Sequence, residues 1–161
     1  MAKARKTSAC AVEAYARSVV AGKVVAGQLA RLACQRHLDD LKKGKARGLR
    51  WDAAAARHAI EFFRHLRHST GEWAGKPFEL QPWQAFVIGS LFGWKRVDGL
   101  RRFRTAYVEV ARKNGKSAML AGISLYALLA DGEPGSHVYA AATTRDQARI
   151  VFGDARILWQ R

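Results

Sequence analysis

The feature that most constrains this chain is the stretch from residue 105 to residue 120, which reads TAYVEVARKNGKSAML. Its first six residues are rich in β-branched and aromatic side chains, as in a strand, whereas the segment from Ser117 onward has the composition of a helix. Residues 111–116 therefore lie where a strand is followed by a helix. Because the N-terminus of a helix attracts anions, this junction predicts a phosphate-binding loop.

The residues of this loop suit a nucleotide triphosphate bound with magnesium. Gly115 lets the backbone fold closely around an anion, Lys116 supplies a positive charge for the β and γ phosphates, and Ser117 offers its hydroxyl to Mg²⁺. Arg112, Lys113 and Asn114 make up the rest of the loop, which we expect to contact the phosphates. The prediction is a P-loop that binds ATP and Mg²⁺.

The loop departs from the usual pattern G-x-x-x-x-G-K-[ST] in one place. Val110 occupies the position of the first glycine, and Arg112 and Lys113 stand where further glycines are common. The tripeptide GKS alone is weak evidence, because Lys116 and Ser117 can also open a helix that binds nothing. The order of strand, cationic loop and helix favours the P-loop over that alternative.

The charge of the chain points to a polyanionic partner. Among 161 residues, 28 are Lys or Arg and 13 are Asp or Glu, which gives a formal net charge of +15. The basic residues are spread through both halves of the chain, and this charge favours nucleic acid over a membrane surface as the partner. A high arginine content also occurs in proteins from GC-rich genomes for coding reasons. The basic charge can therefore also reflect codon usage instead of a polyanionic partner.

The remaining bulk properties indicate a soluble, intracellular protein. With 49% apolar residues, the chain has enough hydrophobic side chains for an ordinary core. Cys10 and Cys34 have no C-x-x-C spacing and suggest neither a zinc site nor a disulfide framework. No segment reaches the roughly 18 apolar residues of a membrane span, and the N-terminus has no signal-peptide pattern. We expect no membrane partner and a cytoplasmic location.

The first 75 residues are predicted to form a helical leader. Apolar residues recur at helical spacing from 12 to 20, ending at Gly22, and again from 25 to 41. Asp52 can cap a third helix, whose expected buried face comprises Ala55, Ala59, Phe62, Phe63 and Leu66. Residues 42–50 (KKGKARGLR) are a basic break that either touches phosphate or is a solvated linker.

The composition changes to Gly, Ser, Thr and Glu over residues 69–76, which we take as a loop and a domain boundary. Pro82 then suits the first position of a helix, with an expected apolar face of Trp83, Phe86, Val87, Leu91 and Trp94. Gln84 lies off that face. Its amide can donate and accept hydrogen bonds at once, as the edge of adenine requires. If this segment stood alone, an exposed polar residue of the helix would be the better interpretation of Gln84.

Residues 95–104 form a basic turn through Asp98 and Gly99. After the loop we expect a helix from 117 to 130, a turn, a second buried strand over 137–142, and a last helix capped by Thr144. Strand, phosphate loop, helix, strand and helix open a parallel α/β sheet. The predicted fold class is therefore α/β: a helical N-terminal leader (1–75) followed by the start of a P-loop NTPase parallel sheet (76–161).

That sheet looks incomplete, because ATP hydrolysis needs a second apolar strand that ends in an acidic residue. Asp131 ends the one apolar run of this kind, but the run continues the helix that starts at Ser117. At 1.5 Å per residue, Asp131 would be roughly 20 Å from the phosphates. We therefore expect this chain to be the front part of something longer, either a truncated gene product or one piece of a split protein.

Three runs together resemble the large terminase subunits of tailed bacteriophages, the ATPase motors that package viral DNA: LQPWQ at 80–84, RRFRTAYVEVARKNGKS at 101–117 and YAAATTRDQAR at 139–149. The chain looks like the subgroup whose P-loop reads ARKNGKS without the first glycine, which explains Val110. The resemblance extends into the helical leader, through ACQRHLDDL at 33–41, so it covers nearly the whole chain.

The resemblance implies a role for each matching residue. Gln84 would read adenine, Lys116 would hold the phosphates, Ser117 would bind Mg²⁺, and Arg112 would stabilise or sense the γ phosphate, which makes Arg112 and Lys116 the catalytic pair. Thr143, Thr144 and Gln147 follow the second strand, where such motors place a coupling segment. The implied partners are double-stranded DNA, the small terminase subunit and the portal of the procapsid, in the cytoplasm of a bacterial host cell.

The acidic strand, the coupling motif and the nuclease domain of the family lie beyond Arg161, so we expect this chain alone not to cut DNA and to turn over little ATP. One competing hypothesis is a non-catalytic, basic helical protein that binds nucleic acid and in which GKS is incidental. A small P-loop kinase is a third, disfavoured by the missing acidic strand and the short C-terminal region.

Overall fold

The computed structural model describes residues 8–68, 72 and 74–159, with side chains from residue 11 onward. The chain divides into two compact units. The first comprises residues 1–60 and 80–106, and the second comprises residues 61–79 and 107–161. Half of the loop expected over residues 69–76, namely residues 69–71 and 73, lies outside the described residues, as does the side chain of Cys10. Cys34 is buried and is a free thiol.

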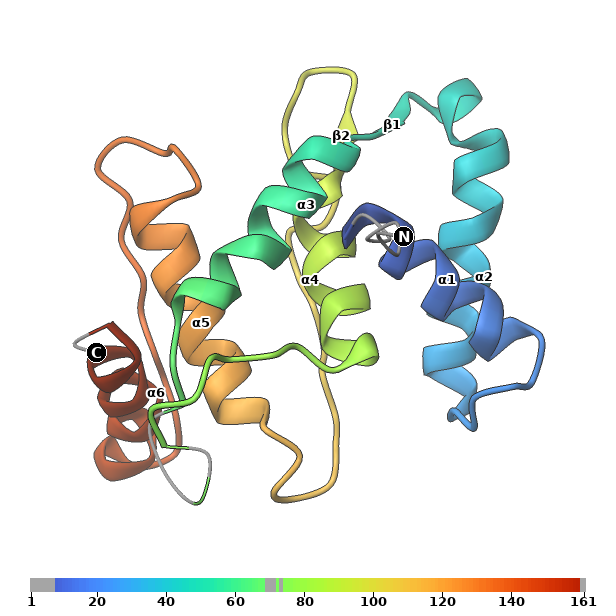
Figure 1. Cartoon of the computed structure of the whole chain (residues 1–161). Helices are drawn as coiled ribbons and strands as arrows, with labels where there is room; N and C mark the ends of the chain where they lie inside the picture. The colour runs from blue at the N-terminus through green and yellow to red at the C-terminus, as the bar shows by residue number, and fades with distance from the viewer. Residues whose placement is uncertain (1–7, 69–71, 73, 160–161) are drawn as a thin grey trace, which may run out of the picture. The chain divides into compact units, whose positions relative to one another are not determined.

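The first unit consists mainly of helices (Figure 1). In chain order it contains α1 (Ser8–Val20), α2 (Gln28–Lys43), the 3₁₀ turn η1 (Gly44–Arg47), β1 (Leu49–Trp51), most of α3 (Ala53–Phe62), α4 (Pro82–Gly93) and β2 (Trp94–Arg96). The helices expected over 12–20 and after Asp52 are thereby confirmed, and the helix expected over 25–41 forms but begins only at Gln28, with Val25 exposed before it. Asp52 caps α3 as predicted, since its Oδ1 accepts a hydrogen bond of 3.0 Å from the Ala55 amide.

Helix α1 packs against both α2 and α4 through small contact residues. Val12, Ala16 and Val19 of α1 are fully buried. A side chain added to Gly89 of α4 would lie 2.5 Å from Val12 and so could not fit. This glycine therefore sets how closely α1 and α4 approach.

Strands β1 and β2 of the first unit pair antiparallel, with Leu49 opposite Arg96, Arg50 opposite Lys95 and Trp51 opposite Trp94.

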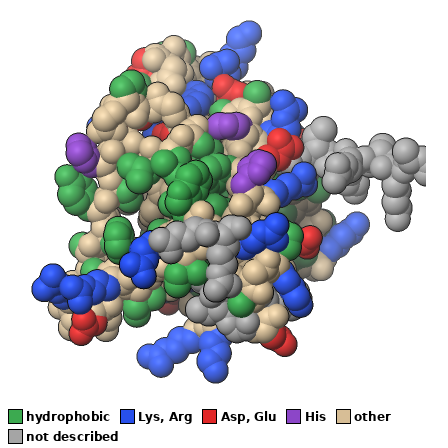
Figure 2. Space-filling view, turned by 60° about the vertical axis from the view of Figure 1, so that its left-hand side comes forward, with side chains coloured by type: hydrophobic (Ala, Val, Ile, Leu, Met, Phe, Trp, Pro, Cys, Tyr) green, Lys and Arg blue, Asp and Glu red, His purple; other side chains and the backbone are tan. Residues whose placement is uncertain are grey.

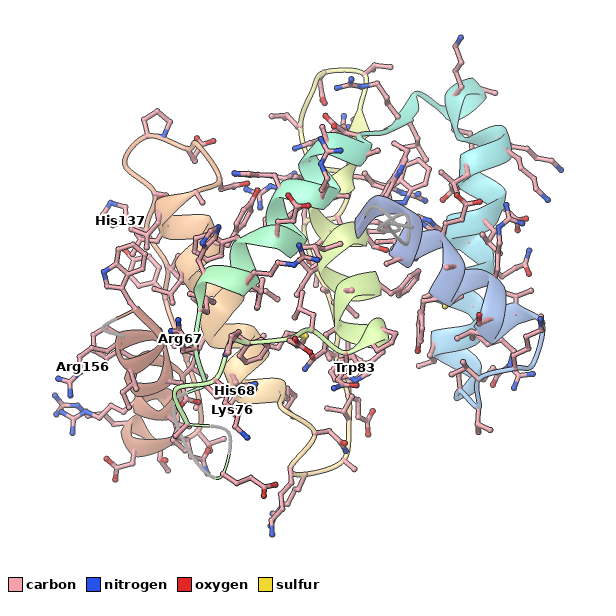
Figure 3. All side chains as sticks on the ribbon, in the orientation of Figure 1. Arg67, His68, Lys76, Trp83, His137 and Arg156 are labelled. Atoms are coloured by element: carbon pink, nitrogen blue, oxygen red, sulfur yellow. The ribbon has the colours of Figure 1, made fainter. Side chains whose placement is uncertain are left out.

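The second unit contains η2 (Phe63–His65), α5 (Lys116–Leu129) and α6 (Arg145–Trp159), and α5 packs on α6. Phe63 is fully buried against Gly122 of α5, where an added Cβ would lie 2.2 Å from the phenyl ring. Arg67 and His68 lie near Lys76 on the paired segments that follow η2 (Figure 3).

The two strands expected over 105–110 and 137–142 do not form in the part of the chain that the structure describes. Tyr107 and Tyr139 are 80% and 87% exposed, so neither segment is buried as predicted. Parallel strands are stable only beside other strands and under cover on both faces, and neither segment has a strand neighbour among the described residues. Over the described residues the fold is helical with one small antiparallel sheet, which is consistent with an α/β class in its coarsest form. None of the described helices is long and apolar enough to cross a membrane.

His37 of α2 is buried in the core of the first unit, where its Nδ1 accepts a hydrogen bond of 3.0 Å from the indole N–H of Trp94. The ring also lies edge-on to Trp51 and Phe86. Burial lowers the pKa of His37 to about 4; Glu13 acts in the opposite direction and Arg102 in the same direction as burial. The imidazole is therefore neutral in the folded protein at neutral pH.

Acidification is expected to destabilise the first unit through His37. The unfolded chain takes up a proton near the ordinary pKa of 6.5, whereas the folded chain does so near 4, so the stabilisation is complete above pH 6.5 and is lost as the pH falls toward 4. Protonation would also turn Nδ1 into a donor facing the Trp94 donor. In urea unfolding at pH 7 and pH 5, the free energy of unfolding of the wild type should depend on pH more steeply than that of His37→Gln, by up to about 1.4 kcal/mol per pH unit. Equal slopes for the two proteins would contradict the prediction.

Candidate nucleotide-binding site

The predicted phosphate loop forms a tight, exposed turn directly before α5. Lys113 has φ +66° and Gly115 has φ +72°, so left-handed residues stand on either side of Asn114. The side-chain amide of Asn114 donates a hydrogen bond of 3.2 Å to the Ala111 carbonyl and closes the turn. Consecutive turn conformations of this kind direct backbone N–H groups toward a common point and make an anion-binding concavity.

The left-handed conformation at Lys113 is unexpected for a residue with a side chain, since it costs roughly 1–2 kcal/mol in an L-residue other than glycine. Sequence reasoning missed it because no local signal distinguishes Lys113 from its neighbour Arg112. Sparsely populated backbone conformations of this kind cluster at ligand sites. Gly115, by contrast, adopts the same region without strain, which explains why glycine stands there.

The N-terminus of α5 is left open for an anion. Gly115 occupies the cap position and offers no side-chain cap, and no acidic residue lies in the first turn. The first N–H groups of the helix and the positive end of its dipole are therefore available to a phosphate. Met119, fully buried one turn into α5, fixes this end of the helix in the second unit.

The charged side chains of the loop all face solvent. Arg112, Lys113 and Lys116 are exposed, and Ser117 is half-buried in the first turn of α5. The nearest carboxylate in the sequence, Glu109, accepts a hydrogen bond of 3.0 Å from the Tyr107 hydroxyl, and this bond raises the pKa of Tyr107. The donor set of the loop, namely backbone N–H groups, two ammonium groups, a guanidinium and a hydroxyl, suits a triphosphate with a magnesium ion.

Gln84 belongs to the first unit, whereas the phosphate loop belongs to the second. Its side chain is buried, not exposed, and its Oε1 accepts a hydrogen bond of 2.9 Å from the backbone N–H of Gln81. This bond forms half of a capping box at the start of α4, where Pro82 occupies the first helical turn as predicted. The structure therefore gives Gln84 a capping role, and its adenine-reading role stays a prediction.

The buried face of α4 differs from the predicted one. Phe86 and Trp94 are buried as expected, but Trp83, Val87 and Leu91 are only half-buried (Trp83 is labelled in Figure 3). The fully buried positions are instead Gln84, Ala85, Phe86, Ile88, Gly89, Phe92 and Gly93. Because α4 is apolar on nearly all sides, spacing alone could not select a face, and the glycines that permit close packing decided it.

Thr143, Thr144 and Gln147 lie together at the start of α6. The Thr144 hydroxyl accepts a hydrogen bond of 3.3 Å from the backbone N–H of Gln147, which confirms the predicted cap. The Thr143 hydroxyl donates a bond of 2.7 Å to the Gln147 side chain. Helix α5 ends at Leu129, so Asp131 follows the end of the helix opposite to the phosphate loop, as expected.

Comparisons with known proteins identify a family that resembles the part of the chain containing this loop. Residues 82–160 match the family model described as terminase large subunit, ATPase domain, and this range contains every residue of the candidate site. The chain is 32% identical to the terminase large subunit of Enterobacteria phage HK97 over 83 aligned residues. These residues make up 51% of this chain. The chain spans 16% of the length of that relative. No solved structure matches the chain significantly.

Both comparisons confirm the resemblance that the three sequence runs suggested. The family match begins at Pro82, the first residue of α4, and runs through the phosphate loop and α5 to the end of α6. Helices α1 to α3 lie outside it. Residues 82–160 of this chain therefore resemble the ATPase domain of a terminase large subunit.

Proposed function

We propose that the chain is an ATPase segment of a terminase large subunit that binds ATP with Mg²⁺ for the packaging of viral DNA. The observation that carries the proposal is the turn at Lys113 and Gly115, which leads into the uncapped N-terminus of α5 inside the family match. In this proposal the segment from 76 to 161 opens a P-loop fold in which residues 105–110 and 137–142 pair as parallel strands once neighbouring strands are present. The DNA, the small terminase subunit and the portal of the procapsid are its proposed partners.

Each loop residue has a distinct task in this proposal. The backbone of Lys113, Asn114 and Gly115 surrounds the phosphates, Lys116 neutralises their charge, and Arg112 stabilises the charge that develops on the γ phosphate. Gln84 reads adenine after its side chain leaves the cap of α4, and Thr143, Thr144 and Gln147 couple the site to α6. Bound Mg²⁺ would draw charge from the β and γ phosphate oxygens, and the Ser117 hydroxyl is the side chain placed to hold it.

Binding, and not turnover, is the activity that we propose for this chain by itself. Hydrolysis requires a carboxylate at the tip of a second strand. Asp131 follows a helix, and Asp146 and Asp154 lie within α6. We therefore expect nucleotide binding to be measurable without a matching rate of ATP hydrolysis.

Removal of magnesium, by EDTA, is expected to weaken ATP binding in calorimetric titrations of the folded chain. Ser117→Ala should lose most of the affinity that Mg²⁺ adds, because the mutation removes the proposed hydroxyl ligand. Ser124→Ala is the matched control, since Ser124 lies on the same helix and its hydroxyl bonds only to the Leu120 carbonyl among the described residues. An identical response to Mg²⁺ in wild type and Ser117→Ala would remove Ser117 from the site.

A folded chain that binds no ATP in either condition would overturn the proposal. The competing function, a basic helical protein that binds nucleic acid without a nucleotide, would then be favoured. Salt-sensitive DNA binding that persists without any nucleotide binding is the result that this alternative requires.

A further inference from the structure

Three cations from distant parts of the sequence lie in one row on the first unit. Arg50 of β1 is directly opposite Lys95 of β2, and Lys95 also forms an antiparallel bridge with Arg101. Residues that oppose each other in antiparallel pairing project from the same face. We call Arg50, Lys95 and Arg101 the cation row.

This arrangement is unfavourable for the isolated protein. Adjacent strands lie about 4.8 Å apart, so the backbone positions of the three residues fall within roughly 10 Å. Like charges directly opposite each other destabilise a sheet. Arg50 has a carboxylate of Asp52 at 3.7 Å, and Arg101 lies over the Phe92 ring at 5.1 Å. Among the described residues, no carboxylate pairs with Lys95, so the row has an unbalanced positive charge at Lys95.

The surroundings add to this excess. Lys42, Lys43 and Lys45 precede β1 by a few residues. A cleft of about 550 Å³ lies against β1 and β2, and its lining includes Lys45, Arg50 and Arg96. Its one acidic lining residue, Asp40, is already paired with Arg47 and Arg102. Of the lining cations, Arg50 and Arg96 have carboxylate partners in Asp52 and Asp98, whereas Lys45 has none among the described residues.

The remaining carboxylate of this region is also engaged. Asp98, in the turn after β2, pairs with Arg96 at 3.2 Å and accepts a hydrogen bond from the Leu100 amide. The two basic segments of the sequence, 42–50 and 95–104, thus meet through the β1–β2 pairing instead of acting as separate linkers. Figure 2 shows Lys and Arg side chains spread over the face that it presents, in keeping with the net charge of +15.

We propose that the cation row binds the phosphate backbone of double-stranded DNA. Duplex DNA carries one negative charge per about 1.7 Å of helix axis, a density that a compact row of cations neutralises with release of counterions. The choice of duplex DNA over another polyanion rests on the proposed function. The surface itself lies outside the phosphate loop and acts without ATP.

The test is the fluorescence anisotropy of a labelled 20-base-pair duplex, titrated with the full chain at several salt concentrations and without nucleotide. Arg50→Gln/Lys95→Gln removes two charges of the row. The matched control, Lys23→Gln/Arg31→Gln, removes one lysine from the segment between α1 and α2 and one arginine from the first turn of α2, the end of that helix farthest from β1 (Figure 1). Circular dichroism of each variant verifies that it is folded.

The row variant should bind the duplex more weakly and reduce the slope of log affinity against log salt by about 1.8, the loss of two phosphate contacts. The control variant should keep the wild-type slope. Equal losses in both variants would overturn the proposal, because they would reflect net charge alone. Binding to vesicles that contain phosphatidylserine but not to the duplex would also overturn it, in favour of a membrane partner.

Calorimetry with ATP separates this inference from the proposed function. Arg50→Gln/Lys95→Gln should bind ATP as wild type does, because the phosphate loop belongs to the second unit. A wild-type chain that binds ATP but shows no difference between the two DNA variants would refute the cation row alone. A chain that binds DNA through the row but binds no ATP would refute the nucleotide site alone.

Discussion

Replacing Asp40 by alanine is expected to lower the free energy of unfolding of the first unit by about 3–5 kcal/mol. The Asp40 side chain is 1% exposed and pairs with Arg102, which is itself only 15% exposed, and with the more exposed Arg47. The Arg102 guanidinium also lies over the rings of Trp94 and Phe103. Truncation of Asp40 would leave a largely buried cation without its counterion, and burial already lowers the pKa of Arg102.

Urea unfolding followed by tryptophan fluorescence measures this loss, since Trp51 and Trp94 both lie beside the ion pair. Asp39→Ala is the matched control: Asp39 is the adjacent residue of α2, it is exposed, and its carboxylate accepts a bond from the Gln35 side chain. Surface substitutions of this kind usually change stability by about 0.5 kcal/mol or less. If Asp40→Ala cost no more than Asp39→Ala, the buried pair would not stabilise the unit.

The Asp40 pair also marks the limit of what the sequence could predict. Asp40 and Arg102 are 62 residues apart, and no periodicity or spacing connects them. The same is true of the cation row, in which Arg50 meets Lys95 only after β1 and β2 pair. Non-local pairing decides which charges are neutralised and which stay in excess.

Local signals, by contrast, predicted the helices well. Asp52, Pro82 and Thr144 each act on neighbouring backbone groups, and each stands at the start of a helix as expected. The strands over 105–110 and 137–142 were predicted from β-branched composition, but a strand is stabilised by its neighbours and not by its own residues. Composition therefore could not show whether these two segments would find partners.

The candidate site also contains one part that local sequence could predict and one part that it could not. The phosphate loop is contiguous in sequence, so its position before α5 followed from the residues alone. Gln84 was predicted from the chemistry of its amide and from the terminase resemblance, and the structure shows its side-chain oxygen engaged in the cap of α4. Whether the loop binds a nucleotide depends chiefly on Lys116, whose side chain is exposed and makes no structural contact among the described residues.

Lys116→Ala is expected to weaken the binding of ATP with Mg²⁺ by roughly tenfold to a hundredfold. A charge-assisted hydrogen bond to a phosphate is worth about 1.5–3 kcal/mol, and each 1.4 kcal/mol corresponds to a factor of ten in affinity. Binding should not vanish, because Arg112, Lys113 and the open N-terminus of α5 keep part of the attraction for the phosphates. The fold should be unaffected, because the truncated side chain is exposed.

Calorimetric titration of wild type, Lys116→Ala and Lys23→Ala measures this effect. Lys23→Ala removes the same charge from an exposed position of the first unit and should bind ATP as wild type does. A loss confined to Lys116→Ala identifies a specific phosphate contact, since net charge falls equally in both variants. Unchanged affinity in Lys116→Ala would mean that the left-handed turn at Lys113 and Gly115 only begins a helix, and duplex binding through the cation row would then be the activity left to explain the basic surface.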